Sequence, residues 1–267
     1  MTFSHRRAGL RAVLGAPSFV RAAPAVAGFA GLLLTGCGPG AAPPAERPPL
    51  KIYVNTDLEG ISGVFKFAQT REKDTPLNIQ ACEYFMGDVA AVVKGLRDGG
   101  ATEVVVLDGH GPQAVLPHLM APGAVYVTGR PRPGAGNLSG LDESFGGMVM
   151  LGLHAMMGTS DGVLNHTQSP KSENRCWYNG VESGELAQNA AIAGHFGVPP
   201  IMVTGDEATC REAKAFFGND VVTVATKRGL SREAACPDSA GPAPVSARRR
   251  QPPARAEGDA AITAPAG

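Results

Sequence analysis

The sequence predicts an α/β fold, in which a mostly parallel β-sheet is covered by helices on both faces. Two observations lead to this prediction. Short apolar runs alternate along the chain with longer segments of helical periodicity. The 267 residues, 43% of them hydrophobic and 18% charged, can bury one substantial core. The formal net charge is zero, and the scattered basic residues argue against a nucleic-acid partner.

The individual elements are predicted from the spacing of apolar residues. Near-continuous apolar runs such as "EVVVL" are typical of strands buried on both faces, and amphipathic runs are typical of the helices that cover them. A glycine pair ends the first long helix, and Ser183 is expected to cap the start of the next one. The predicted strands are 51–57, 103–110, 147–154, 162–167, 199–207 and 220–226. The predicted helices are 79–100, 183–197 and 211–217.

The N-terminal segment 1–36 has the organisation of a signal peptide. Four arginines precede an apolar run, Ala22 to Leu34, that is too short for a permanent membrane span. The run ends in "LTGC", which resembles the lipobox of bacterial lipoproteins, so Cys37 is the predicted lipidation site. Residues 37–49 are then the lipidated cysteine and a Pro/Ala tether. We therefore expect a lipid anchor on the periplasmic side of a membrane in the bacterial cell envelope.

Acidic and histidine side chains gather where the predicted strands end. Because the carboxyl ends of parallel strands meet at one edge of a sheet, these side chains are expected to share a pocket. Asp57 and Glu59, two positions apart on one strand face, would repel each other there unless cations lie between them. The residues concerned are Asp57, Glu59, His110, His154, His166 and Glu185.

Three carboxylates with two or three imidazoles are a ligand set that suits Zn²⁺ or Mn²⁺. Five ligands are too many for one open zinc site and suit two ions about 3.5–4 Å apart. Taken singly, each residue could instead be a turn former, a helix-capping acid or a core histidine. If the other five residues bind the metals, His166 is free to donate a proton or to stabilise an oxyanion. Asp108 could either orient an imidazole or cap a turn.

Several motifs, taken together, resemble the zinc-dependent D-aminopeptidases of the dipeptide-operon type. They are "DLEGISG", "LDGH", "LGLHA" followed by "NH", "NGVESGELAQNA" and "VTGDE", in unbroken order between Lys51 and Leu230. The resemblance implies a homo-oligomeric aminopeptidase with two zinc ions per chain. It would hydrolyse short peptides that begin with a D-residue, typically D-alanine, through a hydroxide activated by both metals. By motif, Asp57, Glu59, His110, His154 and Glu185 match the family's metal ligands, and His166 matches its catalytic histidine.

The pattern of strands and helices stops near residue 236. Residues 237–267 are rich in Pro, Ala and Arg and are predicted to form a disordered tail. Members of the family that the chain resembles continue with a segment that completes the fold and its subunit contacts. The C-terminal part of the family fold is therefore expected to be missing, through a truncated or frame-shifted end or a natural linker. The metallopeptidase-like domain is accordingly expected at 50–236, and its activity in this shortened form is an open question.

Two other functions stay open at this point. A non-catalytic or inactive envelope lipoprotein that binds peptide or metal would share the anchor and the sheet. A dinuclear metal phosphoesterase would share the carboxylates and histidines, since such sites also bind phosphates. Phosphate chemistry usually needs Arg or Lys beside the metals, and only Lys171 and Arg175 are near the site in sequence.

The lipobox leads to the first prediction. Replacing Cys37 by serine removes the thiol that carries the lipid, so an unprocessed and unacylated precursor should accumulate. Mass spectrometry of the membrane fraction measures both the cleavage and the acyl mass. Wild-type protein that is soluble in the periplasm and carries no acyl mass would contradict the prediction.

Overall fold

The computed structural model describes residues 48–132 and 137–237. The predicted signal peptide, Cys37, tether residues 37–47 and tail residues 238–267 lie outside the described residues. Within the described part of the chain, no helix is both long and apolar enough to cross a membrane.

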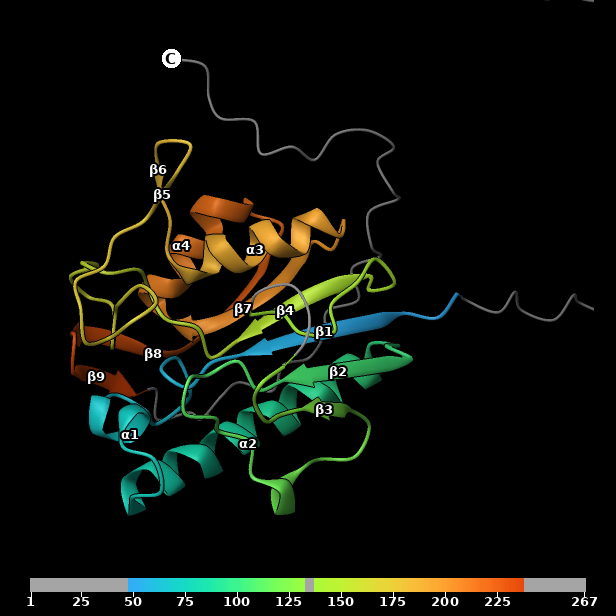
Figure 1. The fold of residues 1–267 in the computed structure, drawn as a ribbon, viewed down its shortest axis with the longest axis horizontal. Coiled ribbons are helices and arrows are strands. Elements are labelled where there is room, and N and C mark those ends of the chain that lie inside the picture. The colour runs from blue at the N-terminus through green and yellow to red at the C-terminus, as the bar shows by residue number, and fades with distance from the viewer. Residues whose placement is uncertain (1–47, 133–136, 238–267) are drawn as a thin grey trace, which may run out of the picture. The chain divides into compact units, whose positions relative to one another are not determined.

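A seven-stranded sheet forms the centre of the fold, in the order β3-β2-β1-β4-β7-β8-β9 (Figure 1). All neighbouring strands are parallel except β8 and β9, which pair antiparallel. The strands are β1 Lys51–Thr56, β2 Glu103–Leu107, β3 Val125–Val127, β4 Gly147–Leu151, β7 Pro200–Asp206, β8 Val222–Ser231 and β9 Ala234–Pro237. The mostly parallel sheet predicted from the sequence is thereby confirmed.

Helices cover both faces of this sheet, as predicted. Figure 1 shows α1 and α2 on one side and α3 and α4 on the other. Along β1, Ile52 and Val54 belong to the core that includes α2, whereas Tyr53 belongs to the opposite core, because successive strand residues point to opposite faces. The helices are α1 Phe67–Arg71, α2 Pro76–Asp98, η1 Pro117–Leu119, α3 Glu185–His195 and α4 Glu207–Phe217.

The strand predicted at 162–167 is wrong, because this segment is an irregular loop. Leu164 has a φ of +53°, which a strand does not accommodate. The Asn165 side chain accepts a hydrogen bond from the backbone amide of Gly158 and donates one to the carbonyl of Gly162. Val163 and Leu164 are buried nonetheless, so their apolar character reflects packing of a loop.

Other differences concern caps and short elements. Gly184, not Ser183, is the N-cap of α3, and the Ser183 hydroxyl donates to the carbonyl of Val181. The sequence prediction also missed α1, β3, β9 and the hairpin of β5 Trp177–Tyr178 and β6 Val181–Glu182. These elements are two to five residues long, which is too short for a hydrophobic period to identify them.

The loop after β1 packs tightly against the loop after β4. The amide of Gly60 donates to the carbonyl of Gly152 at 2.7 Å, and a Cβ at position 60 would lie 2.0 Å from the carbonyl oxygen of Leu153. Only glycine therefore fits at position 60. The ammonium group of Lys227 is buried beneath the same loop and donates to the carbonyls of Glu59 and Ile61, at 2.7 and 2.8 Å.

Replacing Gly60 by alanine should destabilise the protein by about 1–3 kcal/mol or more, because the methyl group overlaps backbone that cannot move independently. Gly87→Ala is the matched control, since Gly87 lies in α2 with no atom within 4 Å of the added methyl group. That change should stabilise the helix by roughly 0.5–1 kcal/mol. Urea unfolding measures both effects, and a Gly60→Ala protein as stable as wild type would refute the packing argument.

Candidate metal centre

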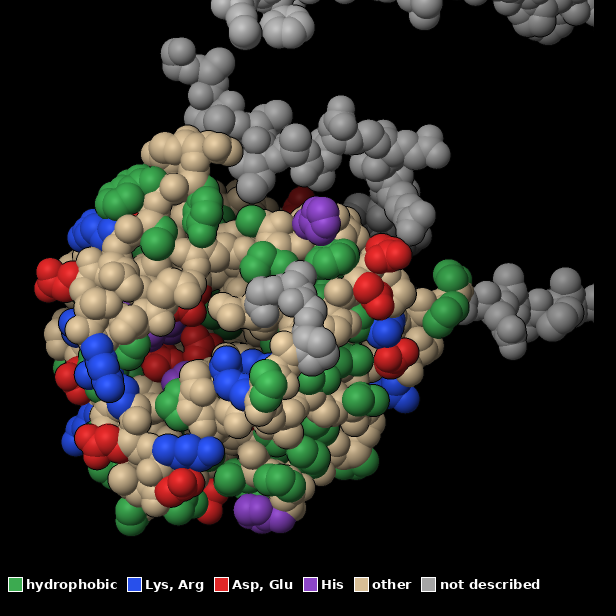
Figure 2. All heavy atoms as spheres, in the orientation of Figure 1, with side chains coloured by type: hydrophobic (Ala, Val, Ile, Leu, Met, Phe, Trp, Pro, Cys, Tyr) green, Lys and Arg blue, Asp and Glu red, His purple; other side chains and the backbone are tan. Residues whose placement is uncertain are grey.

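The predicted site residues meet at the carboxyl edge of the sheet. Asp57 and Glu59 follow β1, and Glu185 is the first residue of α3. His110 and His154 follow β2 and β4, and His166 lies in the loop after them. The relative exposure of all except Glu185, which is half-buried, is 8% or less. A hollow on the molecular surface exposes acidic and histidine side chains to view (Figure 2).

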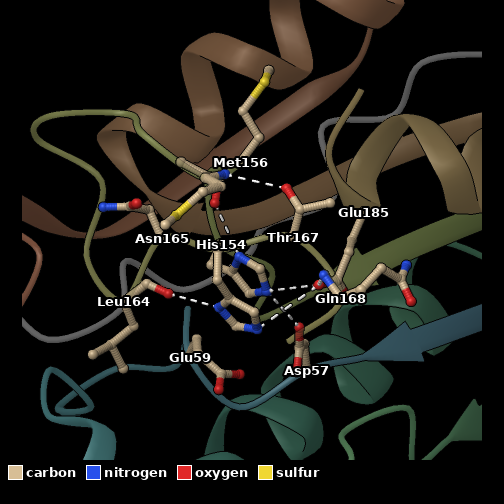
Figure 3. Close-up of polar contacts among 12 residues, drawn as sticks. Asp57, Glu59, His154, Met156, Leu164, Asn165, Thr167, Gln168 and Glu185 are labelled. Atoms are coloured by element: carbon tan, nitrogen blue, oxygen red, sulfur yellow. Dashed lines mark hydrogen bonds and ion pairs between the residues drawn. The ribbon is translucent and has the colours of Figure 1, made fainter. Parts of the chain in front are cut away.

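The Nε2 atom of His154 lies at the centre of the cluster. It is 3.4 Å from Oδ2 of Asp57 and 3.5 Å from Oε1 of Glu185. The His166 ring stacks on that of His154 with a centroid distance of 3.9 Å, and its Nε2 lies 3.8 Å from the same Glu185 oxygen. Figure 3 shows His154 together with the carboxylates of Asp57, Glu59 and Glu185.

These side chains form two overlapping groups with the spacing of metal ligands. One group is His154, His166 and Glu185, and the other is Asp57, Glu59 and His154, with ligand atoms within 4.8 Å of one another in each. His110 joins the second group through Glu59, whose Oε1 lies 3.4 Å from the histidine Nε2. The structure therefore brings together all six residues predicted from the sequence.

Several buried polar atoms in this cluster have no hydrogen-bond partner among the described residues. They are Oε2 of Glu59, Nδ1 of His110 and Nε2 of His154. A buried polar atom without a partner costs about 1–3 kcal/mol, and more when the group is charged. A cation among the carboxylates and imidazoles would provide partners for Oε2 of Glu59 and Nε2 of His154, so the residues present fit a metal ion.

Backbone carbonyls fix the orientation of two imidazoles. Nδ1 of His154 lies 3.0 Å from the carbonyl oxygen of Ala155, and Nδ1 of His166 lies 2.8 Å from that of Leu164. When each ring is neutral with its proton on Nδ1, donated to a carbonyl, Nε2 carries the lone pair and faces the cluster. This is the arrangement in which a histidine ligates a metal through Nε2.

Without a metal, the charges of the cluster perturb each other strongly. Burial, reinforced by the charge of Glu59, raises the pKa of Asp57 well above its ordinary value. Burial alone would raise the pKa of Glu59 too, but the imidazole of His110 lowers it well below. Burial opposes protonation of the histidines, yet Glu59 raises the pKa of His110 to about 9 and Glu185 raises that of His154 to about 10. Protonated His110 and His154 thus offset the negative charge of the carboxylates.

His166 behaves differently from the other two histidines. Burial, and then the charge of His154, lowers the pKa of His166 to about 4. Its ring is consequently neutral at physiological pH.

Asp108 organises a turn. Its carboxylate accepts hydrogen bonds from the amides of Ala114 and Val115, at 3.0 and 3.1 Å, and from the hydroxyl of Thr128 at 3.0 Å. Within the described ranges it makes no hydrogen bond to His110. Of the two roles considered from the sequence, these contacts match turn capping.

Sequence reasoning missed two arginines beside the cluster. Arg71 and Arg232 both lie over the ring of Phe67, which is 6.4 Å from the ring of His166. Both arginines are far from His166 in the sequence, so no motif indicated that they would lie beside Phe67. Arg175, which is near His166 in sequence, instead pairs with Glu182 at 2.9 Å.

Comparisons with known proteins identify relatives of this chain. A family model described as D-aminopeptidase matches residues 50–256, beyond residue 230 where the motif resemblance ends. A D-aminopeptidase from Bacillus subtilis (strain 168) is 31% identical over 192 residues, which cover 69% of this chain and 66% of that protein. A solved structure, the Zn-dependent D-aminopeptidase DppA from Bacillus subtilis, described as a self-compartmentalizing protease, matches with a TM-score of 0.66 and 30% identity. This match covers 71% of the present chain and 68% of the other, so the chain spans about two thirds of the length of these relatives.

Zinc binding should release protons. His110 and His154, with pKa values of about 9 and about 10, are protonated at pH 7 in the metal-free protein, and an imidazole must be neutral to ligate a metal. At least about two protons should leave per chain, and zinc affinity should weaken as pH falls from 8 to 6, by roughly a hundredfold per unit while two protons compete.

Calorimetric titration in buffers of different ionisation enthalpy counts these protons. His154→Gln should lower the count by one, whereas His118→Gln, at an exposed residue of η1, should leave it unchanged. Zinc binding that is independent of pH would contradict the assignment.

Proposed function

Because the chain belongs to the D-aminopeptidase family, we propose that it is a zinc-dependent aminopeptidase that removes an N-terminal D-residue, D-alanine above all, from short peptides. The observation that carries the proposal is the buried cluster of carboxylates and imidazoles, with unpartnered atoms on Glu59, His110 and His154. These groups face one another at the carboxyl edge of the sheet. No apolar core needs so many ionisable groups.

We propose that two zinc ions per chain occupy the cluster. The residues that would hold them are Asp57, Glu59, His110, His154 and Glu185. Bound zinc supplies Lewis acidity, which polarises a carbonyl group and lowers the pKa of a water molecule. Bound zinc would also hold the free amino group of a peptide, which favours cleavage at the N-terminus.

His166 is proposed to move a proton. Its ring is buried and its Nδ1 is committed to the carbonyl of Leu164, which leaves Nε2 to face the cluster. Nε2 can therefore accept a proton from the attacking water and deliver it to the nitrogen of the leaving amine. His166 also has the spacing of a ligand with His154 and Glu185, so metal binding is the competing role.

The setting of the reaction is proposed from the sequence and from the relatives. The lipobox at Cys37 would place the enzyme in the cell envelope, where it would meet D-alanine peptides released from the cell wall. A homo-oligomer is proposed because the matched structure is described as self-compartmentalizing. A non-catalytic lipoprotein and a metal phosphoesterase are the alternatives that the next experiment addresses.

The function is tested by supplying the full chain with zinc and four substrates in parallel. D-Ala-D-Ala should be hydrolysed, L-Ala-L-Ala much more slowly, and an aryl phosphate not at all. A chelator should abolish turnover and added zinc should restore it. Turnover of the aryl phosphate alone would establish the phosphoesterase, and equal rates for D and L peptides would refute the proposed stereochemical preference. A fourth substrate, D-Ala-D-alaninamide, also carries a D-residue at its N-terminus and serves the comparison in the next subsection.

His166→Ala separates chemistry from metal binding. The variant should retain its zinc, because five other ligands remain. Turnover of D-Ala-D-Ala should fall by about a hundredfold or more, with little change in KM, since a proton donor acts in the transition state. His195→Ala, at the exposed end of α3, is the control and should behave as wild type. Joint loss of zinc and activity would make His166 a ligand, and full activity would remove it from the mechanism.

A further inference from the structure

Two arginines from distant parts of the chain meet at the edge of the site. Arg71 ends α1, and Arg232 lies in the turn between β8 and β9. The Cζ atoms of Arg71 and Arg232 lie 3.6 and 5.0 Å from the centre of the Phe67 ring. Phe67 is 6% exposed and meets the ring of His166 at 6.4 Å with an interplanar angle of 65°. In Figure 2, Lys and Arg side chains flank the hollow that contains acidic and histidine side chains.

Each guanidinium is oriented by a carbonyl of the loop that carries His166. Arg71 donates through Nη2 to the carbonyl of Pro170, and Arg232 donates through Nε to that of Asn165 at 3.1 Å. An arginine has five N–H donors, so each group keeps most of them for another partner. Nε of Arg71 is buried and has no hydrogen-bond partner in the described part of the chain.

The acid nearest this pair is Glu233, whose carboxylate accepts a hydrogen bond from the amide of Phe67 at 3.1 Å. Within residues 48–132 and 137–237, neither guanidinium forms an ion pair. Burial, and next the charge of Arg232, lowers the pKa of Arg71, while Glu233 and Glu59 act in the opposite direction. Arg71 is thus within electrostatic reach of Glu59 in the cluster. An anion near both guanidiniums would relieve their repulsion and accept hydrogen bonds from their free N–H groups.

We propose that Arg71 and Arg232 bind the C-terminal carboxylate of the peptide substrate. This inference rests on the proposed aminopeptidase function and names the feature of the substrate that the site would read. Planar guanidiniums match a carboxylate in charge and in hydrogen-bond geometry. Stacking on Phe67 keeps both groups in place while their edges stay available.

The position of the pair also sets a length for the substrate. An extended peptide spans about 3.3–3.6 Å per residue, so two residues span about 7 Å. The Phe67 ring on which the guanidiniums lie is 6.4 Å from the ring of His166, the proposed proton donor. This separation is on the scale of a few residues of extended chain, so a short peptide is the expected substrate.

A purely structural role is the rival explanation. In that case the arginines only anchor the 165–170 loop through the carbonyls of Asn165 and Pro170. Loss of either arginine would then disturb His166 and slow the cleavage of every substrate by the same factor. The two explanations differ in whether the effect depends on the carboxylate of the substrate.

The test compares D-Ala-D-Ala with D-Ala-D-alaninamide, which lacks only the negative charge. Wild-type protein should favour the acid by roughly tenfold to a hundredfold in kcat/KM, which is the scale of a charged hydrogen bond. The difference should lie mainly in KM. Arg71→Gln and Arg232→Gln should each raise KM for the acid and leave the constants for the amide nearly unchanged. Arg71→Lys, which keeps the charge, should retain part of the preference.

Arg97→Gln is the matched control, because Arg97 also donates to a backbone carbonyl, that of Thr102 at 2.5 Å, but lies at the C-terminal end of α2. It should not alter the preference for the acid. Equal cleavage of acid and amide by wild type, or an equal loss for both substrates in the Gln variants, would overturn the inference while leaving the aminopeptidase intact. If wild type cleaves neither peptide, the proposed function fails and the inference falls with it.

Discussion

The burial of like charges at one edge of the sheet is the constraint on which the site depends. Asp57 and Glu59 cannot both be ionised in a buried position unless positive charge lies between them. In the metal-free protein that charge comes from protonated His110 and His154, whose pKa values rise to about 9 and about 10. Zinc would replace those protons with a more concentrated charge and would satisfy the unpartnered ligand atoms. The cluster is therefore costly as a core and appropriate as a metal site.

The backbone around the cluster is shaped to keep these charges in place. Parallel pairing brings the carboxyl ends of β2, β1 and β4 next to one another. The loops that follow these three strands therefore bring their side chains together. Gly60 lets the loop after β1 touch the loop that carries His154. Beneath it, Lys227 donates to the carbonyls of Glu59 and Ile61, which strand pairing leaves unsatisfied. Burial lowers the pKa of Lys227 to about 8, and those carbonyls, with Asp206 and Asp88 nearby, offset part of that cost.

Sequence patterns predicted the parts of this arrangement that follow from strand ends. Apolar runs located β1, β2 and β4, and the polar residues directly after them proved to be neighbours in space. The same reasoning failed at 162–167, where Val163 and Leu164 are buried in a loop and imitate a strand. It could not find Arg71 and Arg232, because their meeting at Phe67 depends on tertiary packing and leaves no spacing in the chain. The predicted lipobox at Cys37 lies outside the described residues and stays a prediction.

Anomalous diffraction at the zinc absorption edge, from crystals of the full chain grown with zinc, tests the central claim most directly. The account predicts two anomalous peaks among the side chains of Asp57, Glu59, His110, His154 and Glu185, each with ligand atoms at about 2.0–2.2 Å. Nε2 of His166 should lie beyond that distance from both peaks. A folded, zinc-supplied protein without an anomalous peak in this cluster would contradict the account.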